Sequence, residues 1–198
     1  MAGALGPFAS VSRLRAGPPR TTISEMVVRR AKAGDGVQIG LVHMRTWQSA
    51  YRGLVPQPFL DGLDADQRGE YWEHYLSEGT KTGEGALVAE EEGSVVGFAS
   101  VGPSRDEDAH VEGEVWAVYV LAERWGQGIG RALMDAARGG LRQAGFSEAT
   151  LWALATNERA RRFYEAGGWA LDGATKEDNS RGFPLTEVRY RRDLDPEP

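Results

Sequence analysis

Apolar residues follow two different periods along residues 26–194, which predicts a mixed α/β domain. Short apolar runs rich in Val, Leu and aromatic residues fit strands, and longer stretches with apolar residues three or four apart fit helices. The predicted strands are residues 26–31, 85–91, 94–102, 115–121, 149–155, 169–171 and 186–192. The predicted helices are residues 34–53, 56–77, 129–144 and 157–167, so seven strands and four helices make up one domain.

The two ends of the chain lack this periodicity. Residues 1–24 are rich in Gly, Pro, Ala, Ser and Arg, which predicts a disordered N-terminal extension. A transit peptide is an alternative because the segment has no acidic residue, and Met26 directly before the first strand is an alternative start. We expect one domain over residues 25–194 and a loose end at residues 195–198.

Composition excludes several classes of chemistry. The chain has no cysteine, so it has no disulfide, thiol nucleophile or cysteine-ligated metal. The histidines His43, His74 and His110 match no metal-binding spacing, and we therefore expect no metal. No apolar run approaches the roughly 18 residues of a membrane span, so we expect a cytoplasmic protein without a membrane partner.

The charge is distributed unevenly. Three arginines and no acids fall within residues 1–24, so the rest of the chain holds 20 basic and 29 acidic side chains. Such a body repels nucleic acid, which we do not expect as a partner, and attracts cations. A cationic amine substrate would suit this charge, and solubility alone is the alternative explanation.

A glycine-rich segment joins the strand at 115–121 to the helix at 129–144. Gly126, Gly128 and Gly130 let the backbone approach a ligand closely. The free N–H groups and the dipole of the following helix favour an anion such as a pyrophosphate. The dinucleotide pattern G-x-G-x-x-G fails in both registers, and no Gly-Lys pair provides a nucleotide P-loop. A turn without a ligand is the alternative.

Two motifs carry a resemblance to the GCN5-related N-acetyltransferases (GNAT). Residues 125–130, Trp-Gly-Gln-Gly-Ile-Gly, resemble the family's Gln/Arg-x-x-Gly-x-Gly/Ala motif, and residues 157–169 resemble its N-x-x-A-x-x-F-Y-E-x-x-G-F/W motif. Trp125 departs from the first motif, and Arg124 beside it is a candidate for the lost polar contact. The resemblance implies a mostly antiparallel sheet of about seven strands, flanked by four helices, whose fourth and fifth strands splay apart.

The resemblance also implies acetyl-CoA as the co-substrate. It places the pyrophosphate on the amides of the glycine segment and the pantetheine arm beside the fourth strand. A Val120 N–H would polarise the acetyl carbonyl, and Asn157 would contact pantetheine or simply cap its helix. The residues implied in cofactor binding are Val118, Tyr119, Val120, Trp125, Gly126, Gln127, Gly128, Ile129, Gly130, Arg131, Asn157 and Tyr164.

Two residues are candidates for the proton transfers that the resemblance implies. Tyr164 would act as the general acid for the CoA thiolate, and a core aromatic is its alternative role. Glu114 would act as the base for the amine, and an exposed acid at a strand start is the alternative. Because Val120 follows Glu114 by an even number of positions, we predict that both side chains share one sheet face. Glu112 and His110 are other candidates for the base.

An aromatic stretch on the first helix is the candidate acceptor wall. Trp47, Tyr51 and Arg52 offer aromatic faces and a charge, and a core stripe is the alternative. The family resemblance implies an N-acetyltransferase that moves acetyl to a small-molecule or peptide amine by direct attack in a ternary complex. A non-catalytic acyl-CoA-binding regulator and an enzyme for another acyl-CoA are the alternatives. Homodimer formation through the C-terminal edge strand stays open.

Overall fold

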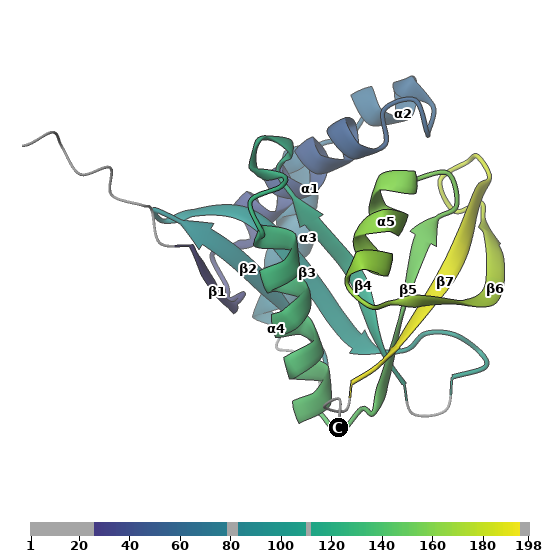
Figure 1. Cartoon of the computed structure of the whole chain (residues 1–198). Helices are drawn as coiled ribbons and strands as arrows, with labels where there is room; N and C mark the ends of the chain where they lie inside the picture. The colour runs from purple at the N-terminus through teal and green to yellow at the C-terminus, as the bar shows by residue number, and fades with distance from the viewer. Residues whose placement is uncertain (1–25, 79–82, 110–111, 195–198) are drawn as a thin grey trace, which may run out of the picture.

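Seven strands form a single sheet in the computed structural model, which describes residues 26–78, 83–109 and 112–194 (Figure 1). The strand order is β1-β2-β3-β4-β5-β7-β6, and all neighbours are antiparallel except β4 and β5. The bounds are β1 Val27–Arg30, β2 Gly85–Glu91, β3 Ser94–Pro103, β4 Glu112–Val120, β5 Glu148–Leu154, β6 Ala170–Asp178 and β7 Leu185–Asp193. The predicted terminal extensions lie outside the described residues.

Five α-helices accompany this sheet, one more than the sequence predicts. They are α1 Gly36–Ala50, α2 Gln57–Asp61, α3 Ala65–Ser77, α4 Ile129–Gln143 and α5 Glu158–Ala166, with a short 3-10 helix η1 at Ala122–Arg124. The helix predicted over residues 56–77 is wrong because Asp64 interrupts it. The Asp64 carboxylate accepts the N–H groups of Asp66 and Gln67 and thereby begins α3 as a separate helix.

Two further boundaries differ from the prediction. Helix α1 ends at Ala50, before the predicted end near residue 53, where Gly53 has a φ of 77°. Strand β6 continues to Asp178, whereas the sequence predicts only residues 169–171 as strand. The residues from 172 onward escaped detection because β6 is exposed along almost its whole length and lacks an alternating apolar pattern.

The helices cover the two faces of the sheet. A side chain at Gly97 would meet Leu133 of α4, whereas the neighbouring Phe98 packs its ring on Trp72 of α3. Because successive strand residues point to opposite faces, α4 covers one face and α1 with α3 covers the other, as Figure 1 shows. No helix of the described residues is long and apolar enough to cross a membrane.

Helices α1 and α3 pack backbone to backbone, which gives a stability test. In Gly40→Ala the new methyl group would collide with the backbone nitrogen of Gly69 and lie 2.7 Å from the Ala65 carbonyl oxygen. We expect the free energy of unfolding to fall by about 2 kcal/mol, the middle of the range for overpacked sites. The matched control is Gly139→Ala on α4, which has open space and should gain up to about 1 kcal/mol of helix propensity.

Urea titrations of both variants measure this difference. An unfolding free energy for Gly40→Ala equal to or above that of the wild type would contradict the close contact between α1 and α3.

Candidate active site

A cavity of about 740 Å³ lies between strands β4 and β5. The two strands pair only from Glu112↔Glu148 to Glu114↔Thr150 and then diverge, as Figure 1 shows. This is the splay that the sequence resemblance predicts. The wall comes from α1, β4, the glycine segment, β5 and α5. It consists of Thr46, Ser49, Ala50, Tyr51, residues 115–120, Arg124, Trp125, Gly126, Gly128, Ile129, Gly130, Arg131, Trp152, Asn157, Arg159, Ala160, Phe163 and Tyr164.

The backbone of β4 offers free polar groups to this cavity. The Leu121 N–H donates to the Val96 oxygen of β3 at 3.0 Å. Because main-chain groups alternate in direction along a strand, the N–H groups of Val120 and Val118 face away from β3 and into the gap. By the same alternation the backbone of Tyr119 pairs with Phe98 of β3, so the Tyr119 amide is not free for a ligand, although Tyr119 lines the cavity.

A bulge in β4 overturns one prediction about Glu114. The register slips between Ser100↔Ala117 and Val101↔Val115, which leaves Trp116 as an extra residue. The extra residue shifts the side-chain alternation by one position. Glu114 therefore lies on the face of Tyr119, towards α1, and not on the face of Val120, so the predicted shared face is wrong.

Glu114 is also occupied by a partner. Its carboxylate is 2% exposed, accepts the Arg105 guanidinium at 2.7 Å and accepts the Arg105 backbone N–H at 2.9 Å. It is absent from the residues that line the cavity. Of the other candidates for the base, Glu112 pairs with Arg191 at 2.9 Å and His110 lies outside the described residues. The geometry therefore gives no support to Glu114 as a base in direct contact with the amine.

The glycine segment has the backbone geometry of an anion site. Gly126 and Gly128 have φ values of 77° and 85°, and a Cβ at either position would meet open space. These two glycines are therefore required by their conformation. Gly128 is the N-cap of α4 and provides no side-chain cap, so the first-turn N–H groups stay available to a ligand. Gly130 differs, because a Cβ there would lie 3.2 Å from the Phe163 ring.

Trp125 replaces the family's Gln or Arg with a different set of contacts. Its indole Nε1 donates to the Val120 carbonyl oxygen at 2.7 Å. The Arg159 guanidinium lies over its ring, 3.1 Å from the ring centre. Arg124, the candidate for the lost contact, is held by Glu91 at 2.8 Å. The arginine that accompanies Trp125 thus comes from α5 and not from the neighbouring residue.

Three arginines bring positive charge to the cavity wall. They are Arg124, Arg131 and Arg159, and within the described part of the chain Arg131 and Arg159 form no ion pair with an acid. Partial burial lowers the pKa of Arg159, although a guanidinium remains charged near neutral pH. Gln127 does not line the cavity with its side chain, which donates to the Glu123 carbonyl oxygen.

Helix α5 brings the two predicted polar residues of the second motif to the cavity. The Asn157 oxygen accepts the Ala160 N–H at 3.1 Å and caps the helix, which leaves its amide N–H₂ for a ligand. Both roles considered for Asn157 are therefore compatible. Tyr164, two turns further along, also lines the cavity. Burial, followed by the nearby Tyr119 and Tyr190, raises the pKa of Tyr164, so its phenol keeps its proton.

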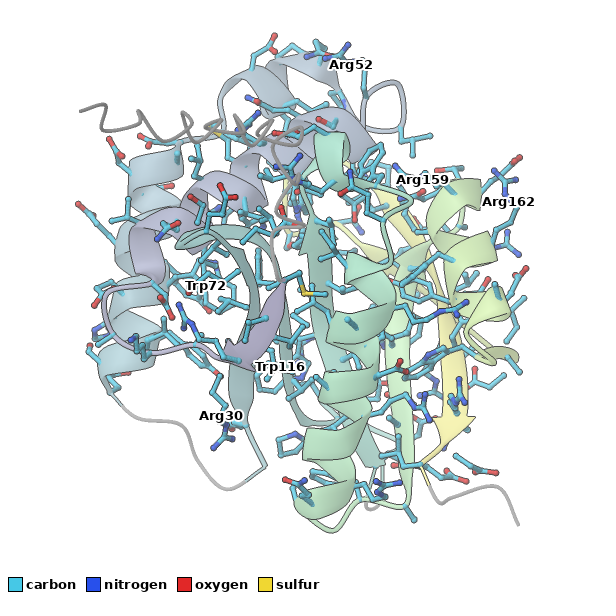
Figure 2. The ribbon with its side chains drawn as sticks, turned by 60° about the vertical axis from the view of Figure 1, so that its left-hand side comes forward. Arg30, Arg52, Trp72, Trp116, Arg159 and Arg162 are labelled. Atoms are coloured by element: carbon cyan, nitrogen blue, oxygen red, sulfur yellow. The ribbon has the colours of Figure 1, made fainter. Side chains whose placement is uncertain are left out.

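The three predicted acceptor residues lie in different places relative to the cavity. Tyr51 lines the cavity, as does Tyr119. Trp47 is 7% exposed and packs behind Tyr51, with their ring centres 4.5 Å apart. Arg52 is exposed at the outer edge of the molecule in Figure 2, and the structure does not bring it to the cavity.

Several wall residues were not predicted from the sequence, among them Arg159, Trp116, Trp152 and Thr46. Arg159 follows Asn157 by two positions in the second motif, and the departure at Trp125 was the signal for a compensating residue. Trp116 and Trp152 reach the cavity only because β4 bulges and β5 diverges, which no local pattern reveals. Thr46 is 3% exposed, and its hydroxyl has no hydrogen-bond partner among the described residues.

Comparison with known proteins decides the family. The sequence profile of the acetyltransferase (GNAT) family matches residues 44–169, a span that includes both motifs. The chain belongs to the GNAT acetyltransferase family. YuaI, an uncharacterised N-acetyltransferase of Bacillus subtilis strain 168, is 37% identical to it over 142 residues, which cover 71% of this chain and 78% of YuaI. The predicted family is thereby confirmed.

Solved GNAT structures share the fold. PaiA N-acetyltransferase of Thermoplasma acidophilum, solved in complex with coenzyme A, superposes with a TM-score of 0.70 at 16% identity, covering 85% of this chain and 99% of PaiA. YncA of Salmonella typhimurium, solved with acetyl-CoA, gives a TM-score of 0.62 at 23% identity, covering 87% of this chain and 95% of YncA. These likenesses confirm the predicted fold class.

Proposed function

We propose that this GNAT protein transfers the acetyl group of acetyl-CoA to a primary amine by direct attack in a ternary complex. The observation that carries the proposal is the coincidence, in one cavity, of an anion-binding helix start, a free strand edge and a neutral tyrosine. Relatives named N-acetyltransferases and fold neighbours solved with CoA or acetyl-CoA support it further.

The donor fits the cavity in three places. Backbone N–H groups of the glycine segment and the positive end of α4 suit the pyrophosphate. The free edge of β4 at Val118 and Val120 suits the amide-bearing pantetheine arm, which would pair as an added strand does. The amide of Asn157 adds a further polar contact from the opposite side of the gap.

The proposed reaction breaks one C–S bond and forms one C–N bond. The amine nitrogen attacks the thioester carbonyl carbon while the Val120 N–H stabilises the charge that develops on the carbonyl oxygen. The CoA sulfur then leaves, and Tyr164 donates its phenolic proton to that thiolate. The proton lost by the amine passes to solvent, from which Tyr164 recovers its own.

We assign the amine proton to solvent because no carboxylate of the described residues lines the cavity. Glu114 is buried and holds Arg105, and the described cavity wall contains no aspartate or glutamate. The non-catalytic alternative is weaker because Tyr164 is both present and kept protonated. The three arginines of the wall lie in η1, in the first turn of α4 and in the first turn of α5, so we assign them to the pyrophosphate and not to a charged acyl group.

Turnover in the presence of an amine panel tests the proposal. Because the chain has no cysteine, a thiol reagent detects released CoA without background from the protein. We expect acetyl-CoA to bind at micromolar strength and CoA release to depend on both the amine and the enzyme. Binding without amine-dependent release for any amine would favour the regulatory alternative, and absence of binding would overturn the donor site.

Arg159 should contribute to the donor site. Replacement by Ala removes a positive charge from the cavity wall and the guanidinium that lies over the Trp125 ring. We expect the dissociation constant of CoA to rise about tenfold, which corresponds to the loss of one charged hydrogen bond. Arg162→Ala is the matched control, because that arginine lies one turn away, points outward in Figure 2 and pairs with Glu158. Calorimetric titration of CoA measures both, and equal affinities would remove Arg159 from the site.

A further inference from the structure

The acceptor end of the cavity is aromatic. Tyr51, Trp116, Tyr119, Trp152 and Tyr164 line it, and they come from the end of α1, from β4, from β5 and from α5. Burial raises the pKa of both Tyr51 and Tyr119, so these hydroxyls stay neutral near pH 7. Such rings offer broad apolar faces and hydroxyl groups but no negative charge.

Cations already lie against the rings of both tryptophans. Lys176 lies 4.0 Å and Arg189 5.6 Å from the Trp152 ring centre, and Arg105 lies 5.1 Å from that of Trp116. A substrate ammonium against either ring would share the same π electrons with a cation that is already present. The two tryptophan rings therefore suit another ring better than a further charge.

These cations are neutralised by acids outside the cavity. Arg189 pairs with Asp108 at 2.7 Å and Asp172 at 2.7 Å, and Lys176 lies 3.5 Å from Glu187. The Trp152 Nε1 donates to Asp106 at 2.9 Å, which fixes the ring in place. The acids of this region are thus paired with these cations or with the indole N–H, and none of the described acids lines the cavity.

We propose that the acceptor is a small primary amine that carries an aromatic ring, and not a polyamine or another polycation. A ring would stack on Trp152 or Trp116, and the Thr46 hydroxyl, which has no hydrogen-bond partner in the described part of the chain, would take a polar substituent. A polycation would have to leave water for a wall that offers its charges no carboxylate. This inference rests on the proposed acetyltransferase function, and it departs from the expectation of a cationic substrate that the net charge of the chain suggests.

Three amines test the inference against acetyl-CoA at saturation. The probes are 2-phenylethylamine, its saturated counterpart 2-cyclohexylethylamine and spermidine, so that aromaticity and charge are varied separately. From the strength of aromatic pairs we expect kcat/KM for 2-phenylethylamine to exceed each of the others about tenfold. In Trp152→Leu this preference should fall to within about twofold, while the KM for acetyl-CoA changes little. Tyr71→Leu, an exposed ring on α3, is the matched control and should retain the preference.

The outcomes separate the two proposals. The aromatic acceptor would be overturned by equal rates for the two ring amines, by faster acetylation of spermidine or by no acetylation of any probe. In each of these cases, binding of acetyl-CoA would still support the proposed donor site. An unchanged preference in Trp152→Leu would also overturn it. Absence of acetyl-CoA binding would instead defeat the proposed function itself.

Discussion

Gly128→Asp should abolish acetyl-CoA binding, with the dissociation constant rising by about 100-fold or more. Gly128 has a φ of 85° and stands directly before the first turn of α4. A carboxylate there would compete for the N–H groups proposed to hold the pyrophosphate and would repel its charge. The substitution would also force an aspartate into the left-handed backbone conformation, which residues with a side chain disfavour. Calorimetric titration of acetyl-CoA into the variant measures the loss.

Two controls separate charge from backbone strain. Gly128→Asn has nearly the shape of the aspartate variant without its charge, and asparagine tolerates positive φ better than most residues, so we expect an intermediate loss of affinity. Gly93→Asp places an aspartate at a φ of 78° in the turn between β2 and β3, and Gly93 is not one of the residues that line the cavity. It should bind as the wild type does. A Gly128→Asp protein that is folded and binds acetyl-CoA normally would refute the anion site.

The fold was predictable wherever nearby residues alone determine the local structure. The turn at Glu92 and Gly93 has φ values of 50° and 78°, as expected for a tight hairpin between two apolar strands. Helix α4 shows an apolar stripe of Ile129, Leu133 and Ala137, all buried in the structure. By contrast, β6 is exposed at nearly every position, and its pairing with β7 depends on distant residues.

The candidate site was predictable to the extent that its residues lie in motifs. The glycine segment reaches the cavity between the end of β4 and the start of α4, and Asn157 and Tyr164 reach it from the N-cap and the last turn of α5. The position of Glu114 was missed because the extra residue Trp116 moves the side chains that precede it in β4 to the opposite face of the sheet. A bulge has no pattern by which it can be recognised in a single sequence. Thr46 was missed because a lone threonine in a helix has no distinguishing pattern.

The neutral phenol of Tyr164 has consequences for the dependence of the rate on pH. Since burial raises the pKa of Tyr164 above its ordinary value near 10, the acid form persists throughout the range in which the enzyme can be assayed. We therefore expect no decline in kcat between about pH 7 and pH 10 from loss of this proton. A rate that increases with pH over that range would report deprotonation of the amine, since no carboxylate of the described wall performs it.

Tyr164→Phe should lower kcat about 100-fold while the KM for acetyl-CoA changes less than about threefold, because general acid catalysis contributes at least that much to the rate. The substitution keeps the ring, which packs at 5.4 Å from Phe163 and 5.9 Å from Tyr190 between ring centres, so the fold of α5 should persist. Tyr71→Phe removes a hydroxyl from an exposed ring and serves as the control. If kcat of Tyr164→Phe matched the wild type, the thiolate would leave without help and Tyr164 would only shape the wall. A loss of kcat that shrinks for an acyl donor with a more acidic thiol would instead identify protonation of the leaving sulfur as the step that Tyr164 assists, since a better leaving group depends less on its acid.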